Sequence, residues 1–404
     1  METLDNKKMK TSEAVLVVLG ILFISFNLRA PITAVGSIVK MIQLEYALDS
    51  TVAGLITTIP LIVFAVVSPF VAKISQKLGH SLTMMIGLLF ILMGEFIRSY
   101  AGVGGLFAGT AIIGIGIAIG NVIIPAIIKK NFSDKVGLVT SIYTSGMCIF
   151  AAVGAGISIP LAEGMNLGWH HALSSWFILT IFTIAIWAPT LFKLKKEVPV
   201  AVQAENKPAT KSKSIWRSGL GWWVTIFMGI QSLIFYSLVA WLPTIIVSKG
   251  LSKDFSGTMA LVFQLMAIPA TLLIPILTGK FKNQKGLVLV TCVIYLVGML
   301  TFLFSNSVGG VATAVVFMAI GMGGAISLSI AFISLRSPNA KRASELSGMS
   351  QSAGYLLAAV GPTLAGAIFE AEGGWTGTLI LLSVLIGILC FCGMYAGASK
   401  TVEE

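Results

Sequence analysis

Twelve long apolar runs divide this chain, and they constrain its fold more than any other feature. Each is close to the length of about 20 residues that a helix needs to cross the hydrocarbon core of a bilayer. The runs lie near residues 14–38, 51–72, 81–100, 105–128, 137–162, 172–192, 219–246, 256–278, 286–304, 308–334, 343–369 and 375–397. This pattern predicts an all-α integral membrane protein of twelve helices.

The polar stretch 193–218 separates six runs from six, which predicts how the chain is divided. We expect an N-terminal six-helix bundle in 1–192, a cytoplasmic linker in 193–218 and a C-terminal six-helix bundle in 219–404. The first run continues to residue 38 without a small-residue cleavage site. We therefore interpret it as a membrane span and not as a signal peptide.

Composition excludes the main soluble alternatives. Charged side chains make up 11% of the 404 residues and hydrophobic ones 56%, whereas soluble domains are about one quarter charged. The net charge of +11 could indicate a nucleic-acid partner, but that requires basic residues gathered on one soluble face. Here they are scattered between the apolar runs. We expect the lipid bilayer as a partner, and no nucleic acid.

The scattered basic residues predict the orientation of the chain. With a cytoplasmic N-terminus, 22 Lys and Arg residues fall in inner segments and four in outer ones. Such residues are enriched in cytoplasmic loops. We therefore expect a multi-pass protein of the cell (plasma) membrane with both termini cytoplasmic. One basic residue is left over, because Arg29 lies within the first run.

The sequence repeats itself at a constant offset of 207 residues. Ile113–Ala118 aligns with Ile320–Ala325, and the segment AAVG at 151–154 aligns with the same letters at 358–361. Each copy holds six spans, an even number, so the copies share one orientation and are parallel repeats about an axis along the membrane normal. The same offset pairs Arg29 with Tyr236 and predicts that they face each other where the two halves meet.

Several motifs narrow the family. The chain has Asn27-Leu28-Arg29-Ala30-Pro31 in its first run, Gly114–Pro125 in its fourth, Gln231-Ser232-Leu233 and Trp241-Leu242-Pro243 in its seventh, and Leu346–Met349 with Gln351 and Tyr355 in its eleventh. Together they resemble the cyanate and 2-nitroimidazole permease branch of the major facilitator superfamily over nearly the whole chain. The resemblance implies the major facilitator fold and a secondary carrier that works by alternating access.

One segment departs from the pattern of that superfamily. Many members carry an acidic residue in the loop between spans 2 and 3, where its carboxylate contacts a helix terminus. Here the segment 72–80 places Lys73 near that position. This gating contact is therefore in doubt for the N-terminal half.

Arg29 is the strongest candidate for function. It lies about 15 residues into the first run, which at 1.5 Å per residue is near the middle of the membrane or slightly outward. A charge there costs about 2.5–3.5 kcal/mol and suggests a functional role. Ser25, Thr33 and Gly36 share its helical stripe, which favours a polar groove, and Pro31 can interrupt the span.

The chemistry of the guanidinium suggests what Arg29 binds. Its planar fork fits groups that present paired oxygens. We predict that it anchors a small anion or a polar heteroaromatic with a cyanate-, nitro- or carboxylate-like group. The alternative is a structural arginine bonded to carbonyl groups or to Glu95.

Other polar side chains at membrane depth are predicted to line the same substrate site. They are Tyr236, Gln231, Asn121, Tyr143, Gln351, Tyr355 and Trp241. Asn121 could equally serve helix packing, and Trp241 could equally be an anchor at the membrane surface. Gln264 and Met147 are weaker candidates.

Glu95 and Arg98 form a second candidate pair, because Glu95 is the one carboxylate well inside an apolar run. Two interpretations are open: an ion pair at the outer rim of the third span, or a group that couples transport to an ion. His80, His170 and His171 fall in loops or at span ends and are poor candidates for a proton relay.

We expect neither a cofactor nor a metal ion. The four cysteines lie in apolar stretches, and we interpret them as core residues; they are Cys148, Cys292, Cys390 and Cys392. We expect a monomer. An efflux pump for hydrophobic cations is the main alternative, but such pumps tend to carry acidic residues at mid-membrane. A receptor or a membrane enzyme would need a soluble domain or a catalytic motif, and the sequence shows neither.

Overall fold

The computed structural model describes residues 11–48, 50–193 and 214–403. In these ranges the regular structure is helical. The long helices are α1 (Thr11–Asn27), α2 (Ala30–Tyr46), α3 (Ser50–Leu78), α4 (His80–Tyr100), α5 (Gly102–Asn131), α6 (Val136–Ile159), α8 (Trp176–Lys193), α10 (Gly219–Ser248), α11 (Lys253–Leu265), α12 (Ile268–Thr278), α13 (Lys285–Phe304), α14 (Val308–Leu335), α15 (Ala340–Glu372) and α16 (Thr376–Ala396), with short segments η1 (Ser133–Lys135), η2 (Pro160–Gly164), α7 (Gly168–Ser174) and η3 (Ile215–Arg217).

Twelve spans in the described part of the chain are long and apolar enough to cross a membrane. They coincide with the twelve predicted runs, from Thr11–Val39 to Thr376–Ala396. Three of them each consist of two α-helices: α1 and α2 share the first span, α7 and α8 share the sixth, and α11 and α12 share the eighth. The predicted all-α membrane architecture is confirmed.

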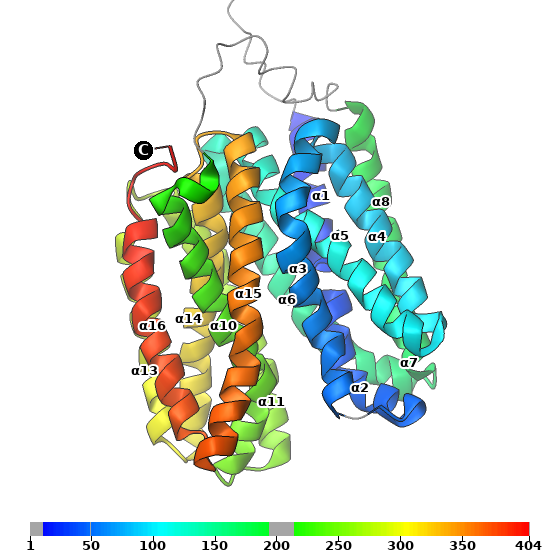
Figure 1. Ribbon diagram of the computed structural model, residues 1–404, viewed down its shortest axis with the longest axis vertical. Helices are drawn as coiled ribbons and strands as arrows, with labels where there is room; N and C mark the ends of the chain where they lie inside the picture. Colours follow the sequence, from blue (N-terminus) through cyan, green and yellow to red (C-terminus); the bar gives the residue numbers. More distant parts are fainter. Residues whose placement is uncertain (1–10, 49, 194–213, 404) are drawn as a thin grey trace, which may run out of the picture.

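The helices pack side by side in two groups (Figure 1). Helices α1–α8, blue to green, form one group, and helices α10–α16, green to red, form the other. Between the groups α3 and α5 pack against α15, and α6 packs against α12. We call this contact the seam. Most of the predicted linker, residues 194–213, lies outside the described residues.

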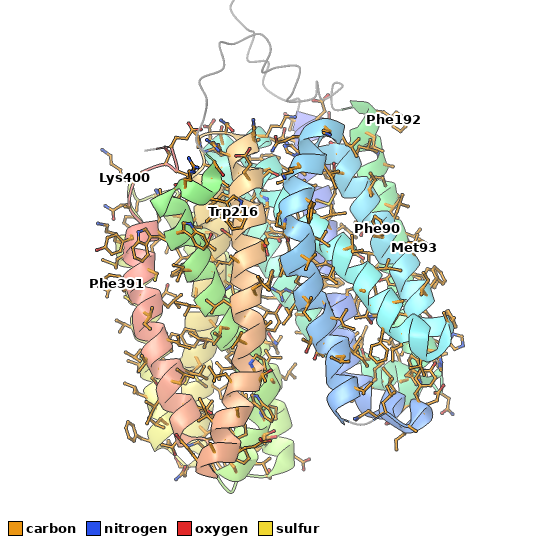
Figure 2. All side chains as sticks on the ribbon, viewed as in Figure 1. Phe90, Met93, Phe192, Trp216, Phe391 and Lys400 are labelled. Atoms are coloured by element: carbon orange, nitrogen blue, oxygen red, sulfur yellow. The ribbon has the colours of Figure 1, made fainter. Side chains whose placement is uncertain are left out.

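Large apolar side chains project from the outside of the bundle, as Figure 2 shows around its whole outline. Phe391 on α16 is 55% exposed, Met93 on α4 is 46% exposed and Phe192 on α8 is 87% exposed. Exposing so many apolar groups to water would be unfavourable at about 25 cal/mol per Å². These surfaces are therefore suited to contact with lipid.

One end of the bundle carries the basic loops. Lys77, Lys129, Lys280 and Arg336 stand at or just beyond the ends of α3, α5, α12 and α14. The described C-terminal residues lie at this end, at the top in Figure 1. We call it the basic face and the opposite end the far face.

Glycines let α4 and α5 approach closely, and they give a test of the packing. A Cβ on Gly116 of α5 would contact the carbonyl oxygen of Gly87 and the side chain of Ile91 on α4. Gly116→Ala should therefore lower the free energy of unfolding by about 1–3 kcal/mol, the usual cost of overpacking. The measurement is thermal unfolding in detergent. Gly104→Ala on the same helix is the matched control, because a Cβ there meets nothing within 4 Å. Equal melting temperatures for both variants would contradict the α4–α5 packing.

Candidate functional site at the seam

A break in the first span places Arg29. Helix α1 ends at Asn27 and α2 begins at Ala30, with Arg29 between them at φ −127° and ψ −44°. Pro31 has no N–H to continue the ladder of hydrogen bonds, and it is favoured in the first turn of a new helix. The helical hydrogen bonding resumes directly after the break, because the backbone amides of Ile32 and Thr33 both donate to the Arg29 carbonyl. The predicted interruption at Pro31 is therefore present.

Arg29 faces a cavity in the seam. Its lining comes from both groups of helices: Arg29, Asn121, Tyr143 and Met147 from the first, and Met228, Gln231, Ser232, Phe235, Tyr236, Ile326, Ser329, Ile330, Gln351 and Tyr355 from the second. Only about 20 Å³ of it is open to the centre of a water molecule, which is the room that about one water needs. A larger occupant therefore requires the two groups to move apart.

The guanidinium of Arg29 makes its contacts across the seam. Its Nη1 donates to the hydroxyl oxygen of Tyr236 at 3.3 Å, so the contact predicted from the 207-residue offset is present. Its carbon Cζ lies 5.7 Å from the ring centre of Phe235, a cation–π distance. Tyr355 stands behind, with its ring centre 6.3 Å from that of Tyr236. One cation is thus surrounded by aromatic rings.

The polar groups around Arg29 have spare hydrogen-bonding capacity. The side-chain oxygens Oε1 of Gln231 and of Gln351 are buried and have no hydrogen-bond partner in the described part of the chain. The Gln231 amide donates to the Ser232 hydroxyl at 2.6 Å, and Tyr143 donates to Oδ1 of Asn121 at 3.1 Å. The cavity therefore offers a fixed cation together with acceptors that need donors.

Seven of the eight residues predicted for the site line this cavity, and Trp241 does not. Its Nε1 donates to the carbonyl of Pro362 at 2.9 Å, and its ring lies 5.0 Å from that of Trp375. It packs α10 against α15, five residues beyond Tyr236 and on another face of the helix. The weaker candidate Met147 does line the cavity, whereas Gln264 does not.

The predicted polar stripe around Arg29 is wrong in part. Ser25 lies against Gly146 and Thr33 lies against Gly154, both on α6. The break between α1 and α2 turns the arginine away from these neighbours, so the spacing of an unbroken helix no longer applies. Only Arg29 of this stripe faces the cavity.

Glu95 and Arg98 do not lie on the rim. Both side chains are buried, at 0% and 2% exposure, and they face the interior of the first helix group. Oε2 of Glu95 lies 2.9 Å from the Thr180 hydroxyl of α8, and Nη1 of Arg98 donates to the carbonyl of Pro31 at 2.6 Å. The interpretation as a rim ion pair is therefore corrected to a buried cluster.

Hydrogen bonds close the seam on the side of the basic face. On α15, Ser347 donates to the carbonyl of Asn121 at 3.1 Å and Ser352 donates to that of Ala65 at 2.7 Å. On α6, Ser141 donates to the carbonyl of Leu272 at 2.6 Å. Short polar side chains thus hold the two groups together at the level of the cavity and between the cavity and the basic face.

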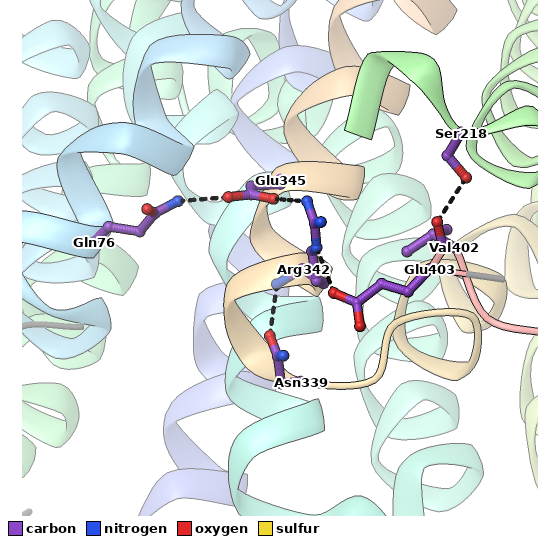
Figure 3. A network of polar contacts seen from close by, with 7 residues as sticks. All are labelled: Gln76, Ser218, Asn339, Arg342, Glu345, Val402 and Glu403. Atoms are coloured by element: carbon purple, nitrogen blue, oxygen red, sulfur yellow. Dashed lines mark hydrogen bonds and ion pairs between the residues drawn. The ribbon is translucent and has the colours of Figure 1, made fainter. Parts of the chain in front are cut away.

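A network of polar and charged side chains lies at the basic-face end of the seam (Figure 3). The Gln76 amide donates to Glu345 at 3.4 Å, Glu345 accepts from Arg342 at 2.7 Å, and Arg342 also binds Glu403 at 2.8 Å. Gln76 lies in the last turn of α3, which ends at Leu78, and Glu345 lies in the second turn of α15, which begins at Ala340. In this loop region the two groups of helices are therefore joined by the side chains of Gln76 and Glu345, and not by a carboxylate from the loop between spans 2 and 3.

Part of the lining was not predicted from the sequence. Phe235, Ser232 and Met228 of α10 and Ser329 of α14 all border the cavity. The repeat contained a usable signal for α14, because Asn121 plus 207 is residue 328, next to Ser329. Phe235 adjoins Tyr236 in the seventh span, but an apolar ring in an apolar run carries no signal of its own.

The sequence model of the Major Facilitator Superfamily matches residues 17–344 and 248–401. The chain belongs to this superfamily. A Bacillus subtilis relative, the uncharacterized transporter YycB, is 41% identical and aligns with 99% of this chain and 97% of its own length. The 2-nitroimidazole transporter of Escherichia coli is 35% identical and aligns with 96% of this chain and 97% of its own length. The cyanate transport protein CynX of the same organism is 23% identical and aligns with 94% of this chain and 95% of its own length.

The solved structures agree on the fold of this major facilitator. The structure of the proton:xylose symporter XylE has a TM-score of 0.76 at 13% sequence identity. The alignment covers 98% of this chain and 99% of the XylE chain. At that identity the likeness concerns the fold alone. The relatives by sequence include transporters of the branch that the motifs indicated.

Proposed function

We propose that this major facilitator is a secondary transporter that carries a small planar anion or polar heteroaromatic across the plasma membrane by alternating access. In this proposal both termini are cytoplasmic, the basic face is the inner face and the protein acts as a monomer without a cofactor. The observation that carries it is the Arg29 guanidinium at the seam cavity, bonded to Tyr236 of the other half.

The cavity suits a flat molecule with both acceptors and donors. Paired oxygens of a nitro or carboxylate group fit the guanidinium fork, and a ring N–H fits the unpartnered oxygens of Gln231 and Gln351. Phe235 and Tyr355 supply apolar walls. A nitroimidazole has all of these features, whereas cyanate has no donor, and a hydrophobic cation would be repelled by Arg29.

The test is ligand-dependent stability of the purified protein. A ligand that binds the folded protein at one hundred times its Kd stabilises it by about 2.7 kcal/mol. We expect 2-nitroimidazole to raise the melting temperature and to enter proteoliposomes, and a lipophilic cation to do neither. Stabilisation by bulky cations alone would favour the efflux pump and contradict the proposal.

Tyr236→Phe should weaken substrate binding about fivefold, because it removes one hydrogen bond of about 1 kcal/mol that orients Arg29. The measurement is the Kd for the ligand identified above. Tyr395→Phe, at an exposed site on α16, is the matched control and should bind as the wild type does. An unchanged Kd in Tyr236→Phe would show that the contact across the seam does not orient Arg29.

A further inference from the structure

The buried cluster of Glu95 and Arg98 has no role in the proposed substrate site. Its hydrogen bonds nevertheless reach the residues on both sides of the helix break at Arg29. Thr180 bridges from Glu95 to Asn27, the last residue of α1, with its hydroxyl 2.7 Å from Oδ1 of Asn27. Arg98 donates to the carbonyl of Pro31, in the first turn of α2. The cluster on α4 therefore holds the two helix ends that flank the break.

Counting hydrogens indicates the protonation state of Glu95. The Thr180 hydroxyl has one hydrogen. Besides a longer contact to the Trp176 carbonyl of its own helix at 3.4 Å, it has two close side-chain partners, Oδ1 of Asn27 at 2.7 Å and Oε2 of Glu95 at 2.9 Å. Both are acceptors if Glu95 is ionised, so one would be left without a donor. A protonated Glu95 resolves this, because it donates to Thr180 while Thr180 donates to Asn27.

The orientation of the Asn27 amide supports this count. Its Nδ2 donates to the carbonyl of Phe23 at 2.9 Å and to the Thr183 hydroxyl at 2.7 Å. Turning the amide over would set its oxygen against the Phe23 carbonyl oxygen, two acceptors with no hydrogen between them. The oxygen of Asn27 therefore points at Thr180 and requires its hydrogen.

Burial supports the same state. Oε1 of Glu95 and both Nε and Nη2 of Arg98 are buried without a hydrogen-bond partner among the described residues. An ionised carboxylate with one free oxygen in such a place is strongly unfavourable. No hydrogen bond joins the two side chains, so the cluster is in the arrangement that a neutral Glu95 allows.

The groups that face this cluster are few. From its own helix there is Arg98, from α8 Thr180 and from α1 Asn27. From α5 there is Gly109, whose missing side chain leaves room for the Arg98 backbone. From α7 there is His171, which bonds the Tyr100 hydroxyl at 2.9 Å at the far-face end of α4. Within this set Glu95, Arg98 and His171 can change or carry charge, and Glu95 alone touches the bridge to Asn27.

We propose that Glu95 is a proton-binding site that couples transport to protons through the break at Arg29. When the proton leaves, the Thr180 hydroxyl turns to Glu95 and Asn27 loses its donor. The new carboxylate also attracts the Arg98 guanidinium away from the Pro31 carbonyl. Both ends of the break then lose a contact, so the position of Arg29 depends on the proton. The coupling step rests on the proposed transport function, whereas the proton site itself does not.

The first experiment needs no substrate. Infrared difference spectra of the purified protein across a pH titration should show the C=O band of a protonated, buried carboxylic acid. We expect Glu95→Gln to lose this band and the exposed Glu163→Gln to keep it. Thr180→Val should keep the band and shift it, because the acid loses its partner. A band that persists in Glu95→Gln, or a wild-type spectrum without it, would overturn the proton site even if the transport function is right.

The second experiment measures coupling in proteoliposomes loaded with the ligand identified above. With one proton per substrate, a gradient of one pH unit changes the steady-state distribution about tenfold. We expect the wild type and Glu163→Gln to show this change, and Glu95→Gln to lose it while still exchanging substrate. A gradient response retained in Glu95→Gln would overturn the coupling role. If no ligand is transported, the proposed function fails and the infrared result still decides the proton site.

Discussion

Arg29→Gln abolishes transport while the protein still folds and inserts. We expect this result because the substitution removes the guanidinium at the seam cavity, and with it the two charge-assisted hydrogen bonds, of about 1.5–3 kcal/mol each, that the guanidinium fork is proposed to donate to the substrate. Losing even one of them lowers affinity more than tenfold. Uptake into proteoliposomes and gel filtration are the two measurements, and a variant that is monodisperse but inactive supports the role.

Two further variants test the role of Arg29 more specifically. Arg29→Lys keeps the charge but loses the planar fork, so it should recover binding of a simple anion better than that of a planar nitro compound. Arg217→Gln changes an exposed basic residue outside the cavity and should leave uptake unchanged. Wild-type uptake by Arg29→Gln would remove Arg29 from the substrate site.

Gly137→Leu should stop the transport cycle by preventing closure of the seam at the basic face. Gly137 is the second residue of α6, and a Cβ there would collide with the carbonyl oxygen of Pro275 on α12. Backbone cannot yield as a flexible side chain can, so the two groups must stay apart. Uptake should fall to background, whereas ligand binding should persist because Arg29 and Tyr236 are untouched.

The effect on closure can be read directly. A cysteine introduced at Ser347, which is buried in the seam, should react with a bulky thiol reagent in Gly137→Leu and be protected otherwise, in a background without the four native cysteines. Gly156→Leu on the same helix is the control, since a Cβ there meets nothing within 4 Å. Protection of Ser347→Cys in both variants would show that the seam closes without this contact.

The sequence predicted the architecture well because membrane burial leaves a strong signal. Apolar length fixed the spans, and the repeat predicted the contact between Arg29 and Tyr236, because residues related by a twofold axis approach each other only near that axis. Helical periodicity was less informative. It placed Ser25 and Thr33 beside Arg29, but a broken helix does not keep one stripe on one side.

The errors share a physical origin. Sequence position gives the depth of a residue in the membrane but not which neighbour it meets. Trp241 is at a suitable depth and turns to Pro362. Glu95 lies within its span, and its side chain turns inward to Thr180. The partner of Glu345 in the first group of helices is Gln76, because the end of α3 presents that residue to α15. Such choices depend on the rotation of each helix, which apolar composition does not determine.

The hydrogen bond between Arg29 and Tyr236 joins positions that are 207 residues apart, the spacing of the repeat. In an ancestral dimer of identical half-length chains, a residue next to the twofold axis would have met its own copy. Two arginines there would have repelled each other, and two tyrosines would have left the centre uncharged. A single guanidinium facing a phenol therefore requires two halves that differ in sequence at this position. The asymmetry of the two repeats is what allows a solitary charge at the centre of the carrier.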